Sequence, residues 1–254
     1  MKRAIIVGNG GCLLNSENGH AIDDFDIVIR FNDFRISGYE KHVGTKVDIM
    51  CHSAFPKLLH MIQKGNDPNC DWWADNGFAY DDYVKTVETV WGCNSKAWME
   101  GRMEHQNWKT GPVTVERIAE ESNIKNFEFL KCYPSFTDRS GFFDNPDGSR
   151  FLYWDKTKTK DHKSATAGLK AIAHAVRAST GITSYDKPCN SCSCKKDHTL
   201  RGYKIFITGF DGLETQHYYS KNGNSQGFTT VGHDSGKEKK WLSMILKSGL
   251  VTQL

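Results

Sequence analysis

The chain has 254 residues, which is enough for one sizeable hydrophobic core, and an α/β domain of this length commonly folds as one unit. Hydrophobic residues make up 38% and charged residues 25% of the chain, so the composition excludes a disordered or fibrous protein. The net charge of +3 is too small to indicate a nucleic-acid-binding protein, and no apolar run is long enough for a transmembrane helix. We therefore expect a globular domain without a nucleic-acid partner.

The N-terminus enters a predicted strand almost at once, which leaves no room for a signal peptide. We therefore expect a soluble protein of the cytoplasm, with at most a peripheral association with a membrane. The 8 cysteines are scattered, and this distribution favours reduced thiols over a disulfide framework. Several of them stand in apolar segments, namely Cys12, Cys51, Cys93 and Cys132.

Short runs rich in β-branched and aromatic residues predict strands over residues 3–7, 27–31, 46–51, 84–91, 126–131 and 203–209. Apolar residues at helical spacing predict helices over residues 112–121, 164–179 and 235–247. This alternation predicts a Rossmann-like, doubly wound, mostly parallel α/β sheet, in which ligands bind beyond the carboxyl ends of the strands. The polar residues 138–163 are predicted to form a long loop or lid.

The first predicted strand runs into a glycine turn, in the sequence "AIIVGNGGCL" at residues 4–13. A dinucleotide-binding fold needs G-x-G-x-x-G here and an acidic residue at the end of the second strand. Leu13 takes the last glycine position and Arg30 stands near the end of the second strand, so the turn does not fit NAD. Glycine amides can approach a ligand closely, and Asn9 can donate and accept hydrogen bonds. Two interpretations stay open: a nucleotide site, or a turn that serves only packing.

Four soft metal ligands are crowded into one polar segment: Cys189, Cys192, Cys194 and His198. A structural zinc ion needs four Cys or His ligands, but this spacing matches no common zinc module. Two interpretations therefore stay open. Either a zinc ion binds these four side chains and stabilises the loop, or the cysteines are free thiols.

The segments "VGNGGCLLNSENGHAID" and "DIVIRFNDFRISGYEKHVGTKVDI" together closely resemble the long sialylmotif of the animal-type sialyltransferases, glycosyltransferase family 29. Three later segments follow in the family's order. Residues 166–169 with "YKIFITGF" at residues 203–210 are similar to the short motif, and "HYY" at residues 217–219 is similar to the third. His233, followed five residues later by Glu238, is similar to the last. The start "MKRAIIVGNG" also resembles the bacterial sialyltransferases of family 42.

The resemblance implies a GT-A-like sialyltransferase architecture, with residues 1–254 as one catalytic domain and residues 52–163, approximately, as a variable acceptor or lid region. It implies an inverting, metal-independent enzyme that needs no cofactor and moves sialic acid from CMP-sialic acid to a glycan hydroxyl. His233 would be the general base, because the pKa of an unperturbed imidazole lies nearest neutrality. His217 would donate a hydrogen bond to the departing phosphate, and Glu238 would orient or anchor its segment.

The expected donor-binding residues come from the glycine turn, the second strand and the later motifs. They are Gly8, Asn9, Gly10, Gly11, Arg30, Asn32, Ser164, Thr166, Ala167, Gly168, Gly209, Tyr218 and Tyr219. Ala167 stands where family members usually carry a Ser or Thr that helps to hold the carboxylate of the donor sugar. Thr166 or Ser164 can replace that hydroxyl, but the difference also leaves open a donor such as CMP-Kdo or another CMP-linked keto-sugar acid. A third alternative is a nucleotide- or glycan-binding protein without turnover.

Animal members of the family carry a cysteine before the glycine turn, whereas this chain has Ala4, so we expect their disulfide to be absent. They also have an N-terminal membrane anchor, whereas this chain begins within the motif region. Both differences favour a bacterial, viral or lower-eukaryotic source with a reducing compartment. Trp72, Trp73, Trp98 and Trp108 in the variable region could form an acceptor platform or lie buried.

Overall fold

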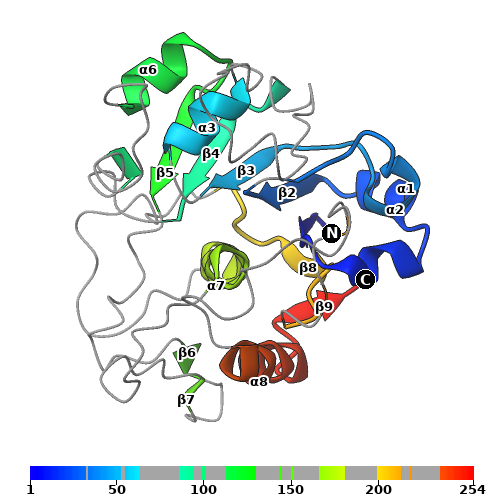
Figure 1. The fold of residues 1–254 in the computed structure, drawn as a ribbon. Coiled ribbons are helices and arrows are strands. Elements are labelled where there is room, and N and C mark those ends of the chain that lie inside the picture. Colours follow the sequence, from blue (N-terminus) through cyan, green and yellow to red (C-terminus); the bar gives the residue numbers. More distant parts are fainter. Residues whose placement is uncertain are drawn as a thin grey trace.

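The computed structural model describes residues 1–32, 34–52, 55–62, 86–93, 99–100, 113–129, 143–144, 150–151, 166–180, 199–212, 215, 218 and 235–254. Within them, the central feature is a 7-stranded sheet in the order β5-β4-β3-β2-β1-β8-β9 (Figure 1). Its strands are β1 (Arg3–Val7), β2 (Ile27–Phe31), β3 (Ile49–His52), β4 (Thr89–Gly92), β5 (Asn126–Phe129), β8 (Lys204–Thr208) and β9 (Val251–Gln253). Every pair of neighbouring strands is parallel, which confirms the predicted sheet.

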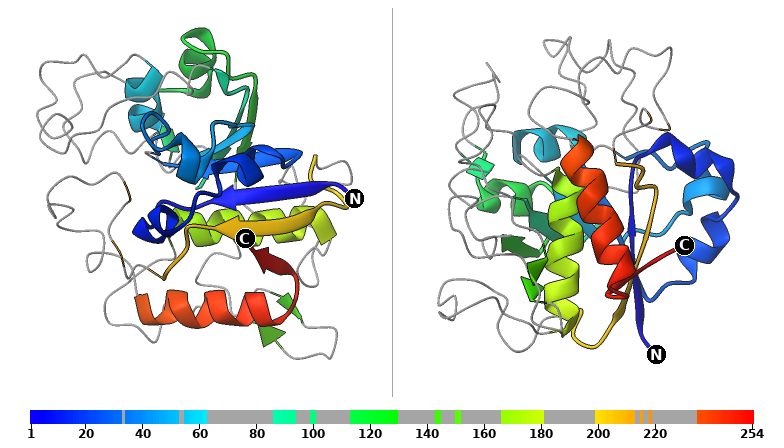
Figure 2. Two further views of the ribbon diagram at one scale, coloured as in Figure 1. Left: turned by 90° about the vertical axis from the view of Figure 1, so that its right-hand side faces the viewer. Right: turned by 90° about the horizontal axis from the view of Figure 1, so that it is seen from below.

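Helices cover both faces of the sheet (Figures 1 and 2). One face carries α7 (Ala167–Thr180) and α8 (Ser235–Lys247), which lie side by side. The other face carries η1 (Gly11–Asn15), α1 (Gly19–Asp23), α2 (Glu40–Val43), α3 (Phe55–Ile62) and α6 (Val115–Glu120). Two further short strands, β6 (Phe143–Asp144) and β7 (Arg150–Phe151), form an antiparallel pair inside the segment that was predicted to be a long loop.

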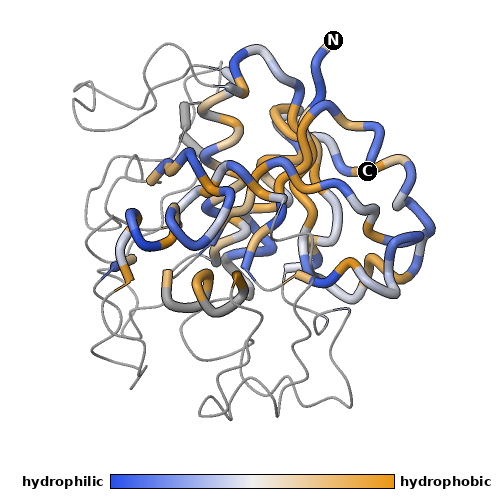
Figure 3. Tube along the Cα trace, turned by 90° about the horizontal axis from the view of Figure 1, so that it is seen from above, coloured by the Kyte–Doolittle hydropathy of each residue, from blue (hydrophilic) through white to orange (hydrophobic). Residues whose placement is uncertain are grey.

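The core consists of two apolar layers, because successive side chains of each strand point to opposite faces of the sheet. Ala4 and Ile6 pack with Ile172 and Trp241 of α7 and α8, whereas Ile5 belongs to the layer under the other helices. The central strands are therefore apolar on both faces, and they form the hydrophobic centre of the hydropathy trace (Figure 3). Such strands appear in a sequence as continuous hydrophobic runs, which is why β1 and β2 could be predicted to the residue.

The strand order reverses at β1, since β2 lies on one side of it and β8 on the other. In a doubly wound sheet, the carboxyl ends of the strands at such a reversal form the usual ligand-binding crevice. The glycine turn follows β1 at this edge, and Gly209 follows β8. The fold therefore brings the first and the later motifs to one place.

Candidate functional site

The glycine turn packs directly against the chain that leaves β8. The amide of Gly8 donates to the Thr208 carbonyl at 2.7 Å, and the amide of Gly10 donates to the Gly209 carbonyl at 3.0 Å. The amide of Gly11 donates to the Thr215 hydroxyl at 2.6 Å. These glycine amides are thus bound by the protein itself, so a ligand that used them would have to displace those contacts.

The spacing between the two segments explains why glycine is needed at the turn. A Cβ atom on Gly8 would lie 2.1 Å from the Gly209 carbonyl oxygen, which is backbone and cannot rotate away. A Cβ atom on Gly10 would lie 2.9 Å from both the Gly209 oxygen and the Asp211 carboxylate. The packing interpretation therefore accounts for these glycines, while their contact with a donor stays a prediction.

Two asparagines stand at the carboxyl ends of β1 and β2. Asn9 is 5% exposed, and its Nδ2 donates to the Phe31 carbonyl at 3.1 Å, so it joins the two strand ends. Asn32 adopts φ 52°, a left-handed conformation that Asn tolerates better than most residues, and its amide donates to the Cys51 carbonyl at 2.8 Å. The Oδ1 atom of Asn32 is buried and has no hydrogen-bond partner among the described residues. A buried acceptor of this kind calls for a partner such as a ligand.

The segment that carries the third motif is fastened to the same turn. The Tyr218 amide donates to the Asn9 carbonyl at 3.1 Å. The Tyr218 hydroxyl accepts from the Arg35 amide at 2.9 Å and donates to the Arg35 carbonyl. Its ring also packs edge-on against Tyr39, with 5.1 Å between the ring centroids. Tyr218 is therefore a buried anchor that joins this motif to the ends of β1 and β2.

The N-terminus of α7 is held by the last motif. The Thr166 amide donates to Oε1 of Glu238 at 2.8 Å, and the Thr166 hydroxyl donates to Oε2 at 3.0 Å. The same hydroxyl accepts from the Leu169 amide at 3.3 Å, as a helix cap does. Glu238 is only 4% exposed, so the two helices are joined by a buried carboxylate. The proton of the Thr166 hydroxyl is committed to Glu238, although a contact between Thr166 and a donor stays a prediction.

Gly168 is the second residue of α7 and lies against two aromatic rings. A Cβ atom there would lie 2.8 Å from Phe210 and 2.9 Å from Phe31. These rings stack on each other with 5.6 Å between their centroids. The helix, β2 and the segment after β8 therefore meet at Gly168, and its neighbour Ala167 is partly exposed.

We expect Glu238→Ala to lower the free energy of unfolding by about 2–3 kcal/mol, because the partly buried Thr166 amide and hydroxyl would both lose their acceptor. Thr166→Val, which removes only the hydroxyl, should cost about 1 kcal/mol. Urea unfolding of both single variants and the double variant forms a mutant cycle. The contact predicts that the two losses are not additive, and strictly additive losses would contradict it.

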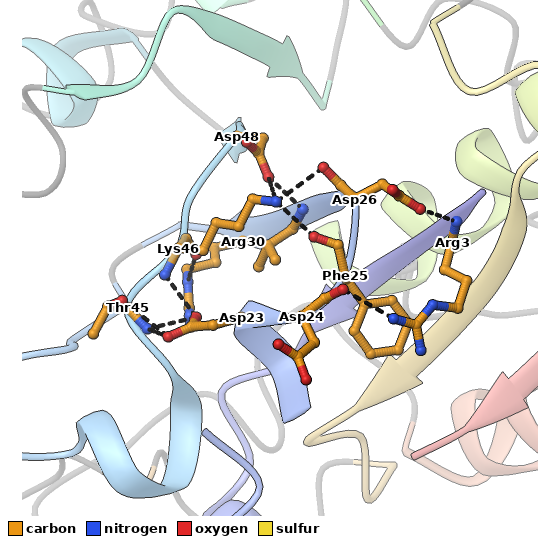
Figure 4. Close-up of polar contacts among 10 residues, drawn as sticks. Arg3, Asp23, Asp24, Phe25, Asp26, Arg30, Thr45, Lys46 and Asp48 are labelled. Carbon is orange, nitrogen blue, oxygen red and sulfur yellow. Dashed lines mark hydrogen bonds and ion pairs between the residues drawn. The ribbon is translucent and has the colours of Figure 1, made fainter. Parts of the chain in front are cut away.

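The second half of the long motif builds a support beneath the site (Figure 4). Arg30 is 1% exposed and donates to the carbonyls of Lys46 and Val43, at 3.0 and 2.6 Å. The Asp23 carboxylate accepts from the amides of Thr45 and Lys46, each at 2.8 Å, and from the Thr45 hydroxyl at 2.9 Å. These contacts hold the turn before β3.

Lys46 completes this support from the other side. Its Nζ donates to the Phe25 carbonyl at 2.5 Å and to the Asp26 carbonyl at 3.0 Å. The Asp26 carboxylate in turn accepts from the Arg3 amide at 2.6 Å (Figure 4). Arg3 is the first residue of β1, Phe25 and Asp26 precede β2, and Lys46 precedes β3, so these contacts lie at the amino edge of the sheet, away from the glycine turn. Donor binding by Arg30 stays a prediction, but its hydrogen bonds to the Lys46 and Val43 carbonyls are those of a structural residue.

Some predicted residues lie outside the described part of the chain. They are His217, His233, Ser164, Tyr219 and the four candidate zinc ligands Cys189, Cys192, Cys194 and His198. Within the described residues, no three His, Cys, Asp or Glu side chains are grouped as a metal site would require. In that same part, none of the helices has the length and apolar character needed to cross a bilayer.

Sequence reasoning missed two residues beside the turn. Asp211 accepts from the Thr215 amide at 3.2 Å and from its hydroxyl, so it orients the hydroxyl that receives the Gly11 amide. Burial raises the pKa of the neighbouring Cys12 thiol above its usual value, and the Asp211 carboxylate adds to this effect. No sequence pattern indicated Asp211 or Thr215, because Gly11, whose amide binds the Thr215 hydroxyl, is 204 positions away in the sequence.

Comparison with known proteins gives a consistent result. The family model described as "Glycosyltransferase family 29 (sialyltransferase)" matches residues 1–250. A lactosylceramide alpha-2,3-sialyltransferase of Rattus norvegicus is 52% identical over 48 residues, which is 19% of this chain and 12% of the rat protein. A CMP-N-acetylneuraminate-beta-1,4-galactoside alpha-2,3-sialyltransferase of Homo sapiens is also 52% identical over 48 residues, 19% of this chain and 13% of that protein.

The matched stretch is thus a small part of these relatives. A crystal structure of a mammalian sialyltransferase superimposes with a TM-score of 0.49 and 15% sequence identity, covering 100% of this chain and 68% of that one.

Proposed function

Because the chain belongs to glycosyltransferase family 29, the sialyltransferases, we propose that it transfers sialic acid from CMP-sialic acid to a hydroxyl group of a glycan. The observation that carries the proposal is the convergence of separate motifs at the reversal of strand order. The glycine turn, Asn32, Tyr218 and the N-terminus of α7 come from distant parts of the sequence and meet at one edge.

The proposed reaction is a direct displacement with inversion. The acceptor hydroxyl attacks the anomeric carbon of the keto-sugar acid as the bond to the CMP phosphate breaks, and the hydroxyl proton passes to His233. The CMP phosphate leaves with the bonding electrons, and a hydrogen bond from His217 stabilises its charge. A phosphate ester of this kind is already a good leaving group, so we propose that positioning and proton transfer suffice without a metal ion.

Support for these roles comes from the segments next to the two histidines. Tyr218 follows His217 in the sequence and is fastened to the Asn9 carbonyl and to Arg35. Helix α8 begins at Ser235, two positions after His233, and its Glu238 binds the N-terminus of α7. Both segments are thereby tied to the edge of the sheet where the donor is proposed to bind.

We expect Asn32→Gly to raise the KM for the CMP-sugar about tenfold or more, because the buried Oδ1 atom would no longer meet the donor. Glycine adopts the left-handed conformation of Asn32 without strain, so the fold should be retained. Initial rates against donor concentration, with thermal unfolding as the control for folding, test this. An unchanged KM would show that Asn32 does not touch the donor.

The donor sugar is a second question, and one observation bears on it. Ala167 offers no hydroxyl, and the hydroxyl of Thr166 already donates to Glu238. The carboxylate of the donor, which sialic acid and Kdo have in common, would therefore rely on other groups. CMP-Kdo or another CMP-linked keto-sugar acid is the alternative donor.

Mass spectrometry of CMP release and of glycosylated products, with several CMP-sugars and a panel of glycans, tests both proposals. The expected result is a product that carries sialic acid. Product from CMP-Kdo alone would favour the alternative donor. CMP binding without any product would instead indicate a nucleotide-binding protein and contradict the enzyme.

A further inference from the structure

Two cysteines meet at the carboxyl edge of the sheet, outside the proposed reaction. Cys51 belongs to β3 and pairs in register with Trp91 of β4, and Cys93 follows β4 directly. Their Sγ atoms are 3.3 Å apart although the residues are 42 positions apart in the sequence. The Cys93 amide also donates to the His52 carbonyl at 2.8 Å, which keeps the two strand ends together.

We propose that Cys51 and Cys93 form a disulfide between β3 and β4 when the chain folds in an oxidising environment, and stay a dithiol when it folds in a reducing one. The sulfur atoms need to approach by only about 1.3 Å to reach the length of a disulfide bond. Each is the nearest thiol to the other among the cysteines that the structure describes, since Cys12 lies at the glycine turn beyond β1.

The oxidant in this proposal is a small disulfide such as glutathione disulfide. One cysteine thiolate attacks it and releases one glutathione thiolate, which leaves a mixed disulfide on the protein. The second cysteine thiolate then attacks the protein sulfur and releases the other glutathione. The pair loses two electrons and two protons, and one glutathione disulfide becomes two glutathione molecules.

The surroundings of the pair determine when this exchange can occur. Cys51 is 0% exposed and Cys93 is 2% exposed, in the layer covered by α7. Burial raises the pKa of the Cys51 thiol well above its usual value, and the hydrogen bond with Cys93 adds to this, whereas Lys170 opposes it. A thiol that is neutral and covered reacts slowly. The redox state that is set during folding is therefore retained in the folded protein.

The disulfide would also restrain the proposed donor site. The Cys51 carbonyl accepts the amide of Asn32, the residue with the left-handed backbone and the buried Oδ1 atom. Linking Cys51 to Cys93 fixes this strand end to its other neighbour. It also closes a loop of the chain that contains α3 and β4.

Refolding from urea in a glutathione redox buffer, followed by acid quenching, alkylation in denaturant and tryptic digestion, tests the proposal. Each cysteine lies in a tryptic peptide that has no second cysteine, residues 47–57 for Cys51 and residues 86–96 for Cys93. We expect these two peptides to be joined, with the mass of two hydrogens lost, and the peptide with Cys12 to be alkylated. Protein that was folded in reductant and then placed in the same buffer should carry both peptides alkylated.

A second measurement does not depend on refolding in vitro. Secretion of the chain into the oxidising periplasm of a bacterial host, compared with its production in the reducing cytosol, should give the joined and the alkylated peptides respectively. The joined form should unfold at a temperature about 5–15 °C higher, and the difference should disappear when that protein is unfolded and refolded in a reductant before the measurement. Cys93→Ala should show neither the joined peptides nor any effect of reductant.

Folded protein from both oxidising routes that carries Cys51 and Cys93 as free thiols would overturn the proposal. Cys51 joined to a cysteine other than Cys93 would overturn it as well. An unchanged KM in the Asn32 variant, or CMP binding without any product, has no bearing on this outcome, so the two proposals can fail separately.

Discussion

Replacing His233 by alanine is expected to lower kcat for sialyl transfer by about 10²–10⁴-fold, which is the usual contribution of general acid–base catalysis. The acceptor hydroxyl would then have to lose its proton to water while the bond to the phosphate breaks. This proton transfer occurs during the reaction and not when the donor binds, so the affinity for the CMP-sugar should be retained. Turnover with saturating donor, together with thermal stabilisation by CMP, separates the two effects.

A matched control for this variant is His20→Ala. The side chain of His20 is 91% exposed on α1 and has no part in the proposed reaction, so its loss should leave both kcat and stability unchanged. The pH dependence of kcat gives an independent readout, because loss of the base should remove the acidic limb of the profile. CMP-sugar consumption by His233→Ala at the rate of the unaltered protein would exclude His233 as the base.

Gly8→Ala is expected to destabilise the fold by about 3 kcal/mol or more, a large fraction of the stability of a typical domain. The new Cβ atom would lie 2.1 Å from the Gly209 oxygen and 2.5 Å from the Gly209 carbonyl carbon. Relief would require β1 and β8 to separate at the hydrogen bond from the Gly8 amide to Thr208, which is 2.7 Å long. Urea unfolding, or the yield of soluble protein if unfolding is complete, measures the effect.

Gly38→Ala serves as the control for this prediction. Gly38 has φ 85° and no atom within 4 Å of a built Cβ, so its replacement carries only the backbone strain of about 1 kcal/mol. A Gly8 variant as stable as the Gly38 variant would show that the two backbone segments are not as close as the structure has them.

Elements with a clear hydrophobic pattern could be predicted from the sequence. β1 and β2 have continuous apolar runs, and the predicted helix over residues 235–247 has the same bounds as α8. β3 was predicted to begin at Lys46 but begins at Ile49, because Lys46 and Asp48 use their side chains to hold the turn before it. β4 likewise begins at Thr89, later than predicted.

Other elements have no pattern that a sequence could display. β9 is only 3 residues long, and α1 and α2 are single turns held by contacts with each other. They were not predicted, since their stability comes from packing and not from periodicity. α3 was not predicted either, although its buried residues Phe55, Leu58, Leu59 and Ile62 stand at helical spacing in the sequence.

In the candidate site, too, the sequence indicated the position of a residue better than the contacts of its side chain. Asn32 was predicted as a donor contact from its place after β2, and its buried Oδ1 atom fits that role without testing it. Arg30 was predicted beside it, but its guanidinium reaches the carbonyls of Val43 and Lys46. The direction in which a long side chain turns depends on partners that a strand pattern does not reveal.

The pairing of β1 with β8 has a consequence for the order in which the protein is made. Arg3 pairs with Lys204, and the Gly11 amide binds a hydroxyl 204 positions later. At a synthesis rate of about 5–20 residues per second, β1 waits on the order of 10–40 s for its neighbour. During that time the glycine turn has no partner for its amides, and one edge of β1 is open. The nascent chain therefore completes the edge of the proposed donor site late, and an N-terminal fragment that ends before β8 would expose a strand edge prone to aggregation.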